Sequence, residues 1–404
     1  MKEIRIGVVG LRRGFPYAKA YANEIAETTL VSVCENDLEY AESIKQELPE
    51  NTQFFQDYDA FLNSGLDAIV LCNFFHEHAK FAIPALERGI SVLSETTAAP
   101  TLGECVALCE AVERTGAKYM LAANVPHMYG CMEMDRLYQQ GKSPFGRVLY
   151  AEGEYFHTSA PAPSVPAGTK PSYHWRKFLP RTYYDMHDFG TLMSITGLMP
   201  RSVNAKAVFA PDIIASKSPT SNVGDIASVI LTEMDSGAIF RTTSCASLGP
   251  SGKWFRLACE NGTIETVRGD QESIKYTYNS WSKPENEELT KTYDAHPEVV
   301  TESQGASGHG GSDYRICLAF VDYLKDRMVP FFDVYRSAAL SAVGILAWRS
   351  VLEDGKGFRI PDFKDKEDRK AVADDFLTPF PNFADGSGIT LPCSSKPYTR
   401  SCGI

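Results

Sequence analysis

Tyr184 and His187 lie in a short polar stretch of the sequence that could exchange protons with a bound substrate. Tyr183, Asp185 and Asp188 surround them and offer hydrogen-bond partners. A histidine titrates near neutral pH, so it can act as a general acid or a general base. We predict that His187 and Tyr184 are catalytic; the alternative for each is a structural role in the core.

Other side chains in the same half of the chain are typical of a ligand pocket. His309 lies in a glycine-rich segment, SGHGGSDY, where the backbone can approach a ligand closely; the alternative is a helix cap. Trp175 and Arg176 are typical of a sugar site, because an aromatic face stacks on a sugar ring and a guanidinium donates to hydroxyl groups. Tyr155 and His157 end an expected strand and are predicted to line the substrate pocket. For Trp175, and for Tyr155 and His157, the alternative is packing in the core.

The N-terminus has the features of a dinucleotide-binding turn. Gly10 and Gly14 both follow the first expected strand, and Arg12 and Arg13 lie between these two glycines. An arginine therefore stands where the motif G-x-G-x-x-G has its second glycine. Such a turn brings the backbone close to a pyrophosphate at a helix N-terminus. Glu35 ends the next expected strand, where a carboxylate binds the ribose and repels a 2′-phosphate. These residues predict NAD rather than NADP; a bare glycine turn and a solvated strand end are the alternatives.

Four further polar residues lie at the carboxyl ends of expected strands, the edge at which doubly wound sheets bind ligands. They are Asn73, His78, Glu95 and Asn124. We predict that they bind the cofactor, with Glu95 on the ribose or nicotinamide side. A structural role for His78 is equally open.

The elements that position these residues change in pattern along the chain. Up to residue 123, strands alternate with helices of about ten residues, as in a doubly wound parallel sheet. From about residue 145, strands follow one another with short turns, as in an antiparallel sheet. We therefore predict an α/β fold: an NAD-binding Rossmann domain at 1–123, an α+β substrate and oligomerisation domain with an open-faced, mainly antiparallel sheet at 124–363, and a tail at 364–404.

The expected bounds of these elements follow from the apolar patterns. In the first part, strands are expected at 4–9, 30–34, 66–72, 90–93 and 118–122, and helices at 17–27, 37–48, 77–88 and 102–114. In the second part, strands are expected at 148–157, 203–209, 227–234, 238–246, 254–259, 263–267 and 273–278, and helices at 188–195, 313–326 and 334–352. Segments 158–173 and 282–312 lack periodicity and are expected to be loops.

Composition excludes several classes of protein. The chain has 404 residues, 44% hydrophobic and 23% charged, which is typical of a globular protein. Its net charge of −11 argues against nucleic acid or an anionic membrane as partner. No apolar run approaches the roughly 18 residues of a membrane span. The ten cysteines are scattered, so we expect reduced thiols and no metal site, and the N-terminal strand leaves no room for a signal peptide, which predicts a cytoplasmic protein.

Several strings of this sequence resemble the Gfo/Idh/MocA oxidoreductase family. They are IGVVGLRRG, FFHEH with His78 and SVLSETTAA with Glu95, and the similarity runs in order over about residues 3 to 363. Within the family the chain is most similar to a branch of NAD-dependent α-N-acetylgalactosaminidases, in AEGEYFH (151–157), His174-Trp-Arg, the 184–190 string YDMHDFG and the 308–314 string GHGGSDY. The resemblance implies a Rossmann domain, bound NAD, a sugar or glycoside substrate, and a homodimer or homotetramer formed through the C-terminal sheet.

The chain departs from the family pattern at three places. The dehydrogenases have Glu-Lys-Pro after the fifth strand, and their lysine relays the hydroxyl proton; here Thr96 and Thr97 replace the lysine and the proline. Tyr183 stands where the dehydrogenases have an aspartate four residues before His187. The glycosidase branch has a glutamate before Asn124, where this chain has Ala123.

Three hypotheses remain open at this point. In the first, NAD oxidises the C3 hydroxyl of a sugar, the ketone acidifies the C2 proton, elimination releases the C1 substituent, and hydration and reduction complete a redox-neutral glycoside cleavage. The second is a plain NAD-dependent sugar or cyclitol dehydrogenase that releases NADH. The third is a non-catalytic NAD or sugar sensor, which the departures at Thr96 and Ala123 favour.

Overall fold

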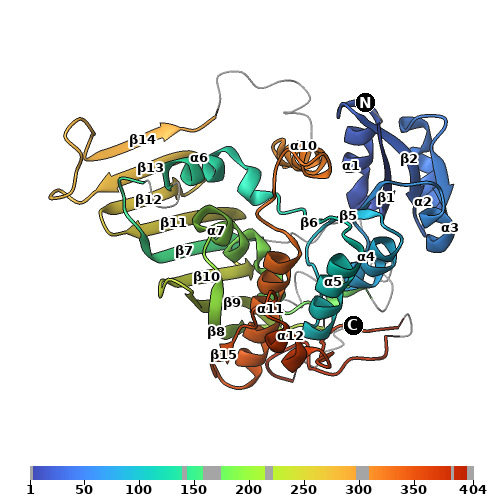
Figure 1. Ribbon diagram of the computed structural model, residues 1–404. Helices are drawn as coiled ribbons and strands as arrows, with labels where there is room; N and C mark the ends of the chain where they lie inside the picture. The colour runs from blue at the N-terminus through green and yellow to red at the C-terminus, as the bar shows by residue number, and fades with distance from the viewer. Residues whose placement is uncertain are drawn as a thin grey trace.

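The chain forms two sheets that lie side by side in the computed structural model (Figure 1). The structure describes residues 3–138, 143–157, 174–213, 222–296, 309–383 and 386–397. The expected loop at 158–173 and Gly308 of the glycine-rich string lie outside these residues. Within the described residues, no helix is long and apolar enough to cross a membrane.

The N-terminal sheet has six parallel strands in the order β3-β2-β1-β4-β5-β6. Its strands are β1 (Ile4–Val9), β2 (Thr28–Cys34), β3 (Gln53–Phe55), β4 (Ala68–Leu71), β5 (Ser91–Ser94) and β6 (Tyr119–Leu121). Its helices are α1 (Leu11–Asn23), α2 (Leu38–Ile44), α3 (Tyr58–Leu62), α4 (His78–Glu87) and α5 (Leu102–Thr115). Every residue of β4 and β5 is buried, as expected for strands covered on both faces. The strand order reverses between β1 and β4, and ligands of such sheets bind at this switch point.

The predicted doubly wound sheet is confirmed, but some of its elements differ from expectation. The first helix begins at Leu11 rather than at 17, and Pro16 lies inside it. A proline inside a helix removes one backbone hydrogen bond. The Glu35 carboxylate, however, accepts a hydrogen bond from the Leu11 amide and so stabilises the start of the helix at Leu11. The sequence also missed β3 and α3, which are too short, at three and five residues, to show a period.

The C-terminal sheet has nine strands in the order β14-β13-β12-β11-β7-β10-β9-β8-β15. These are β7 (Val148–Phe156), β8 (Pro200–Phe209), β9 (Asp225–Met234), β10 (Ile239–Ala246), β11 (Gly252–Cys259), β12 (Gly262–Val267), β13 (Asp270–Tyr278), β14 (Thr290–Asp294) and β15 (Phe358–Arg359). All neighbouring strands are antiparallel except β10 and β7. The mainly antiparallel sheet is therefore confirmed. The loop expected at 282–312 is wrong in part, because 290–294 pair with β13 as an edge strand.

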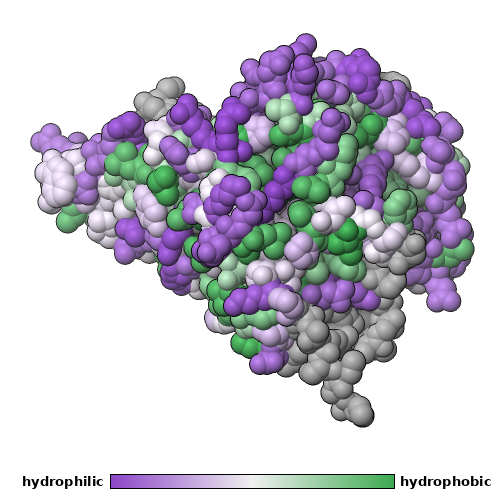
Figure 2. Space-filling view, turned by 90° about the horizontal axis from the view of Figure 1, so that it is seen from below, coloured by the Kyte–Doolittle hydropathy of each residue, from purple (hydrophilic) through white to green (hydrophobic). Residues whose placement is uncertain are grey.

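One face of this sheet is covered by helices and the other is open. The covering helices are α6 (Tyr129–Tyr138), α7 (Phe189–Thr196) and α11 (Val334–Leu352) (Figure 1). The open face exposes apolar side chains, among them Leu149, Val229, Leu231 and Ile239. On the side of the molecule seen in Figure 2, hydrophilic residues predominate and hydrophobic ones gather in smaller patches between them.

Two later helices return to the N-terminal sheet. Helix α10 (Ser312–Leu324) lies beside α1 (Figure 1), and its Ile316 and Phe320 are buried in the same core as Tyr17 and Tyr21 of α1. Helix α12 (Lys366–Val372) begins the tail and contacts α5. The eight cysteines whose side chains the structure describes are free thiols, as predicted.

Candidate active site

The turn after β1 has the shape that a dinucleotide needs. Gly10 has φ +80°, and a Cβ there would stand 2.6 Å from the Cys72 carbonyl oxygen at the end of β4, so only glycine fits. It precedes α1, and as the N-cap residue it offers no side chain to the first amides of the helix; the N-terminus of a helix attracts an anion. Glu35 lies next to this turn and accepts hydrogen bonds from the Leu11 and Asp37 amides at 2.7 and 2.9 Å.

Buried polar atoms line the strand ends beside this turn. Among the described residues, the side-chain amide of Asn73 and the Oδ1 atom of Asn124 are buried without a hydrogen-bond partner. Buried polar groups are rarely left unsatisfied, so both amides are suited to a ligand. His78 is placed differently, because its Nδ1 atom donates to the Thr97 carbonyl at 2.9 Å and so fixes the segment after β5. Arg12 points to the surface and pairs with Asp37 at 2.5 Å.

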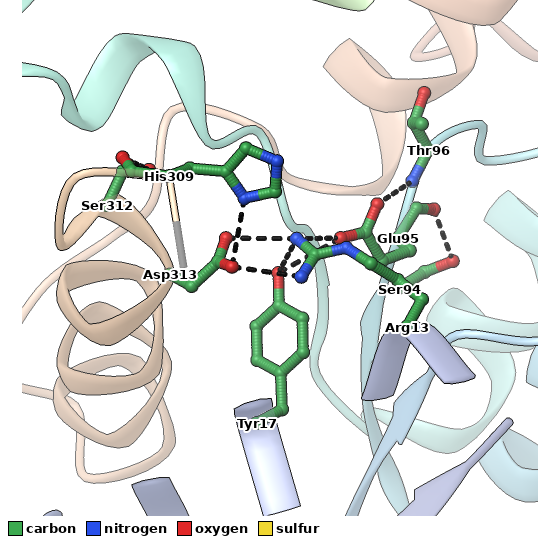
Figure 3. Close-up of polar contacts among 8 residues, drawn as sticks. All are labelled: Arg13, Tyr17, Ser94, Glu95, Thr96, His309, Ser312 and Asp313. Atoms are coloured by element: carbon green, nitrogen blue, oxygen red, sulfur yellow. Dashed lines mark hydrogen bonds and ion pairs between the residues drawn. The ribbon is translucent and has the colours of Figure 1, made fainter. Parts of the chain in front are cut away.

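Arg13 is the centre of a network of charges that joins three parts of the chain (Figure 3). Its guanidinium contacts both carboxylate oxygens of Asp313 at 2.9 Å and Glu95 Oε1 at 2.5 Å. Tyr17 donates a hydrogen bond to Glu95, and His309 Nδ1 lies 3.0 Å from Asp313. Burial alone would raise the pKa of Asp313, but His309 and Arg13 outweigh it and hold that pKa below its usual value. We call Arg13, Glu95, Asp313 and His309 the junction network.

Aromatic rings form a second cluster between the two sheets. Tyr155, at the end of β7, lies 4.6 Å from the His187 ring and 6.0 Å from the Tyr184 ring, between centroids. Trp175 stacks 5.1 Å from Phe75, which follows β4, and 6.2 Å from Tyr184. The structure therefore brings Tyr155, Trp175, Tyr184 and His187 into one cluster, which we call the aromatic pocket, whereas His309 belongs to the junction network. His157 joins it through Tyr155 at 5.7 Å, and Arg176 lies over the Trp175 ring at 4.2 Å.

The electrostatics of the pocket favour a neutral His187. The ring is only 7% exposed, and burial lowers its pKa well below the usual value, helped by the positive charges of Lys253, His309 and nearby groups. A neutral imidazole accepts a proton at pH 7. Its Nδ1 atom has no hydrogen-bond partner among the described residues.

Two buried carboxyl groups lie on either side of His187 in the sequence. Burial raises the pKa of Asp188 to about 7, although hydrogen bonds from the Ser244 hydroxyl at 2.6 Å and from the backbone at Asp188 and Phe189 act in the opposite direction. Burial also raises the pKa of Asp185 well above its usual value. Asp185 packs near α11, where a Cβ on Gly344 would stand 3.3 Å from its Oδ2 atom. Both groups support the fold of the pocket.

Two residues of this region were not predicted from the sequence. Asp313 completes the junction network, and its position in the first turn of an expected helix looked like ordinary capping. Lys253 lies on β11 on the same face as Phe255 and Leu257. A lysine in register with buried apolar positions of a strand is the signal that would have found it.

Comparison with known families agrees with this geometry. Residues 4–123 match the oxidoreductase family with an NAD-binding Rossmann fold, and residues 214–368 match the C-terminal domain of glycosyl hydrolase 109. The chain belongs to the Gfo/Idh/MocA oxidoreductases, in the branch with a glycosyl hydrolase 109 C-terminal domain. NAD is therefore its cofactor, as predicted, and Gly10, Glu35 and the two unpartnered amides fit it.

Individual relatives of this Gfo/Idh/MocA chain include both glycosidases and dehydrogenases. A glycosyl hydrolase family 109 protein of Shewanella putrefaciens is 24% identical, and an α-N-acetylgalactosaminidase of Shewanella oneidensis is 22% identical; each match covers 90% of this chain and 85% of the relative. A levoglucosan dehydrogenase solved with NADH and levoglucosan has a TM-score of 0.73 at 16% identity, covering 89% of this chain and all of that one. The structural likeness supports the fold of the whole chain.

Proposed function

We propose that this protein is an NAD-dependent glycosidase that cleaves a glycoside by oxidation, elimination, hydration and reduction of the sugar. The observation that carries the proposal is the neutral, buried His187 between Tyr155 and Tyr184, at the junction with an NAD-binding domain whose lysine position is Thr96. The glycosyl hydrolase 109 domain on the same chain supports it.

NAD would be held by Gly10, Glu35, Asn73 and Asn124, and it would supply the acceptor, and later the donor, of the C3 hydride of the sugar. The residues of the pocket handle protons and position. Trp175 provides a face for the sugar ring, and the hydroxyl groups of Tyr155 and Tyr184 bind sugar oxygens. Proton transfer by a positioned side chain contributes about 10²- to 10⁴-fold in rate.

His187 accepts the protons that the sugar must lose, because its ring is neutral and lies between the two tyrosines. The C3 hydroxyl proton passes to His187 and from there to solvent as C3 becomes a ketone. His187 then takes the C2 proton and gives it to the leaving oxygen as the C1–O bond breaks. Water adds its hydroxyl to C1 and its proton to C2, and reduction at C3, with one proton from solvent for the C3 oxygen, restores the sugar. His309, a member of the junction network through Asp313, acts electrostatically on His187.

The test follows hydrogen through the reaction. Aryl glycosides of several configurations are incubated with the enzyme in deuterated water. Release of the aglycone without net NADH, with deuterium at C2 of the product, is the expected result. Accumulation of one NADH per sugar with an intact glycosidic bond would show instead a dehydrogenase, which the likeness to levoglucosan dehydrogenase makes the second candidate. If NAD binds but no sugar reacts, the glycosidase proposal is wrong.

We also propose that copies of the chain assemble through the open face of the nine-stranded sheet, which exposes Leu149, Val229 and Leu231. Exposed apolar patches of this kind mark interaction surfaces. From the sequence we also propose that the chain divides into three parts at residues 123 and 363, and that the protein is located in the cytoplasm. Light scattering of the wild type and of Leu231→Lys tests the assembly, since a charge at a self-association face should dissociate it.

A further inference from the structure

The C-terminal tail places one aromatic ring behind the aromatic pocket. This ring belongs to Phe380, which is only 1% exposed and lies in the string Thr378-Pro379-Phe380-Pro381. A proline fixes its own φ angle, and it also restricts the backbone of the residue before it. The two prolines therefore limit the backbone of Phe380 to few conformations.

Hydrogen bonds attach this part of the tail to the rest of the molecule. The Phe380 amide donates to the Thr378 hydroxyl at 3.1 Å, and the Thr378 amide donates to the Thr390 hydroxyl at 2.7 Å. Further along the tail, the Pro392 carbonyl accepts a hydrogen bond at 2.9 Å from the indole of Trp348, which belongs to α11. The backbone at Phe380 is therefore held by its neighbours in the tail, and the tail is held by α11.

The Phe380 ring packs against three other rings. Between centroids it lies 5.5 Å from His76, 5.6 Å from Phe75 and 5.2 Å from Tyr183. All three partners are buried. Phe75 and His76 follow β4 at the edge of the N-terminal sheet, and Tyr183 directly precedes Tyr184 of the aromatic pocket. Phe380 thus contacts both of the chain segments that meet at the pocket.

Phe75 connects Phe380 to the rings of the pocket. Its ring lies 5.1 Å from the Trp175 ring at an interplanar angle of 17°, and 5.9 Å from the Tyr184 ring at 27°. Phe75 is buried, whereas Trp175 and Tyr184 are half-buried, so Phe75 supports them from the side of the core. A smaller side chain at position 380 would leave space beside Phe75, and the surrounding side chains shift partly into such a space. Trp175 should then lose its fixed support.

We propose that Phe380 is a positioning residue for sugar binding, which acts through Phe75 to hold the Trp175 ring in the orientation that stacks on the sugar. Its effect on a substrate rests on the proposed function, but its effect on the position of Trp175 does not. Phe380 does not touch the sugar. A misplacement of about 1 Å caused by a remote substitution can nevertheless cost about 10²-fold in rate.

The first experiment measures KM and kcat for an aryl glycoside with Phe380→Leu, which keeps an apolar side chain but removes the flat ring. We expect KM to rise by about 10- to 100-fold, with a smaller change in kcat and an unchanged affinity for NAD. Phe383→Leu, in the same tail but 64% exposed, and Phe145→Leu are the matched controls. Phe145 is also 1% exposed, but it stacks on Tyr278 and precedes the start of β7, whereas the pocket lies at the end of that strand.

Two results would overturn the inference. One is a KM that is unchanged or rises no more than in Phe145→Leu, which would mean that Phe380 only fills the core. The other is a fall in kcat with an unchanged KM, because stacking on the sugar acts on binding. The route through Phe75 is tested by a double-mutant cycle. Phe75→Leu should raise KM, and adding Phe380→Leu to it should raise KM little further; independent effects of the two substitutions would contradict the route.

A second experiment observes Trp175 without any substrate. The four tryptophans of the chain are replaced by fluorotryptophan, and Trp175→Phe identifies the fluorine resonance of Trp175. Phe380→Leu should shift this resonance and leave that of Trp281, which is 83% exposed, unchanged. If the wild type cleaves no glycoside, the proposed function fails and this spectrum alone decides the inference. A Trp175 resonance that does not move in Phe380→Leu would overturn it.

Discussion

The junction network and the aromatic pocket are neighbours, yet they treat charge in opposite ways. In the junction network, Arg13, Glu95, Asp313 and His309 each contact a group of opposite or complementary charge. In the aromatic pocket, His187 is buried and neutral, and the strongest charges near it are all positive. The first arrangement joins parts of the chain, and the second leaves groups ready for a substrate. Variants of the junction network should therefore change mainly the stability of the fold, and variants of the aromatic pocket mainly the rate of the reaction.

The largest expected effect is in the pocket. His187→Ala should lower kcat by about 10²- to 10⁴-fold, because it removes the proton acceptor, and should leave NAD binding and the far-ultraviolet spectrum unchanged. His127→Ala is the matched control, since burial also lowers the pKa of His127, to about 4, and it lies outside the pocket. Turnover of His187→Ala near that of the wild type would make His187 structural.

Substitutions in the junction network should change the free energy of unfolding. Asp313→Asn removes the charge that faces Arg13 and His309, and its side chain is only 2% exposed, so the free energy of unfolding should fall by about 1–3 kcal/mol. Asp37→Asn removes one partner of the exposed Arg12 pair and should change stability by less than about 0.5 kcal/mol, since an asparagine still caps α2. Urea denaturation of both variants is the measurement. Equal effects of the two would mean that the junction contributes no more than a surface pair.

Asp188, beneath the pocket, should give an effect that depends on pH. Its pKa of about 7 in the fold exceeds the unfolded value of about 3.9, so its contribution to stability is complete below pH 4 and is lost as the pH rises through 7. Asp188→Asn mimics the protonated carboxyl, so its melting temperature should fall less than that of the wild type between pH 5 and 8. Asp235→Asn, in an exposed turn, should follow the wild type. Parallel curves for wild type and Asp188→Asn would show that Asp188 is ionised in the fold.

Sequence patterns were informative where a residue's role depends on its own strand or helix. The main strands of both sheets along the chain and the positions of Gly10 and Glu35 follow from period and local turns, and the structure places them as expected. Asp313 depends instead on partners that are distant in the sequence, among them Arg13, 300 residues away. No local pattern encodes such pairs. Short elements such as β3 and β14 were missed for a related reason, since pairing with a neighbour defines them.

The position of α10 has a consequence for how the protein is made. Its Ile316 and Phe320 complete the core around Tyr17 and Tyr21 of the first helix, but the ribosome synthesises them after most of the C-terminal sheet. At 5–20 residues per second, the roughly 200 residues between the end of the first sheet and the end of α10 take about 10 to 40 s. During that interval the N-terminal part has an uncovered apolar helix. Chaperones that bind nascent chains should therefore contact α1 until α10 has emerged.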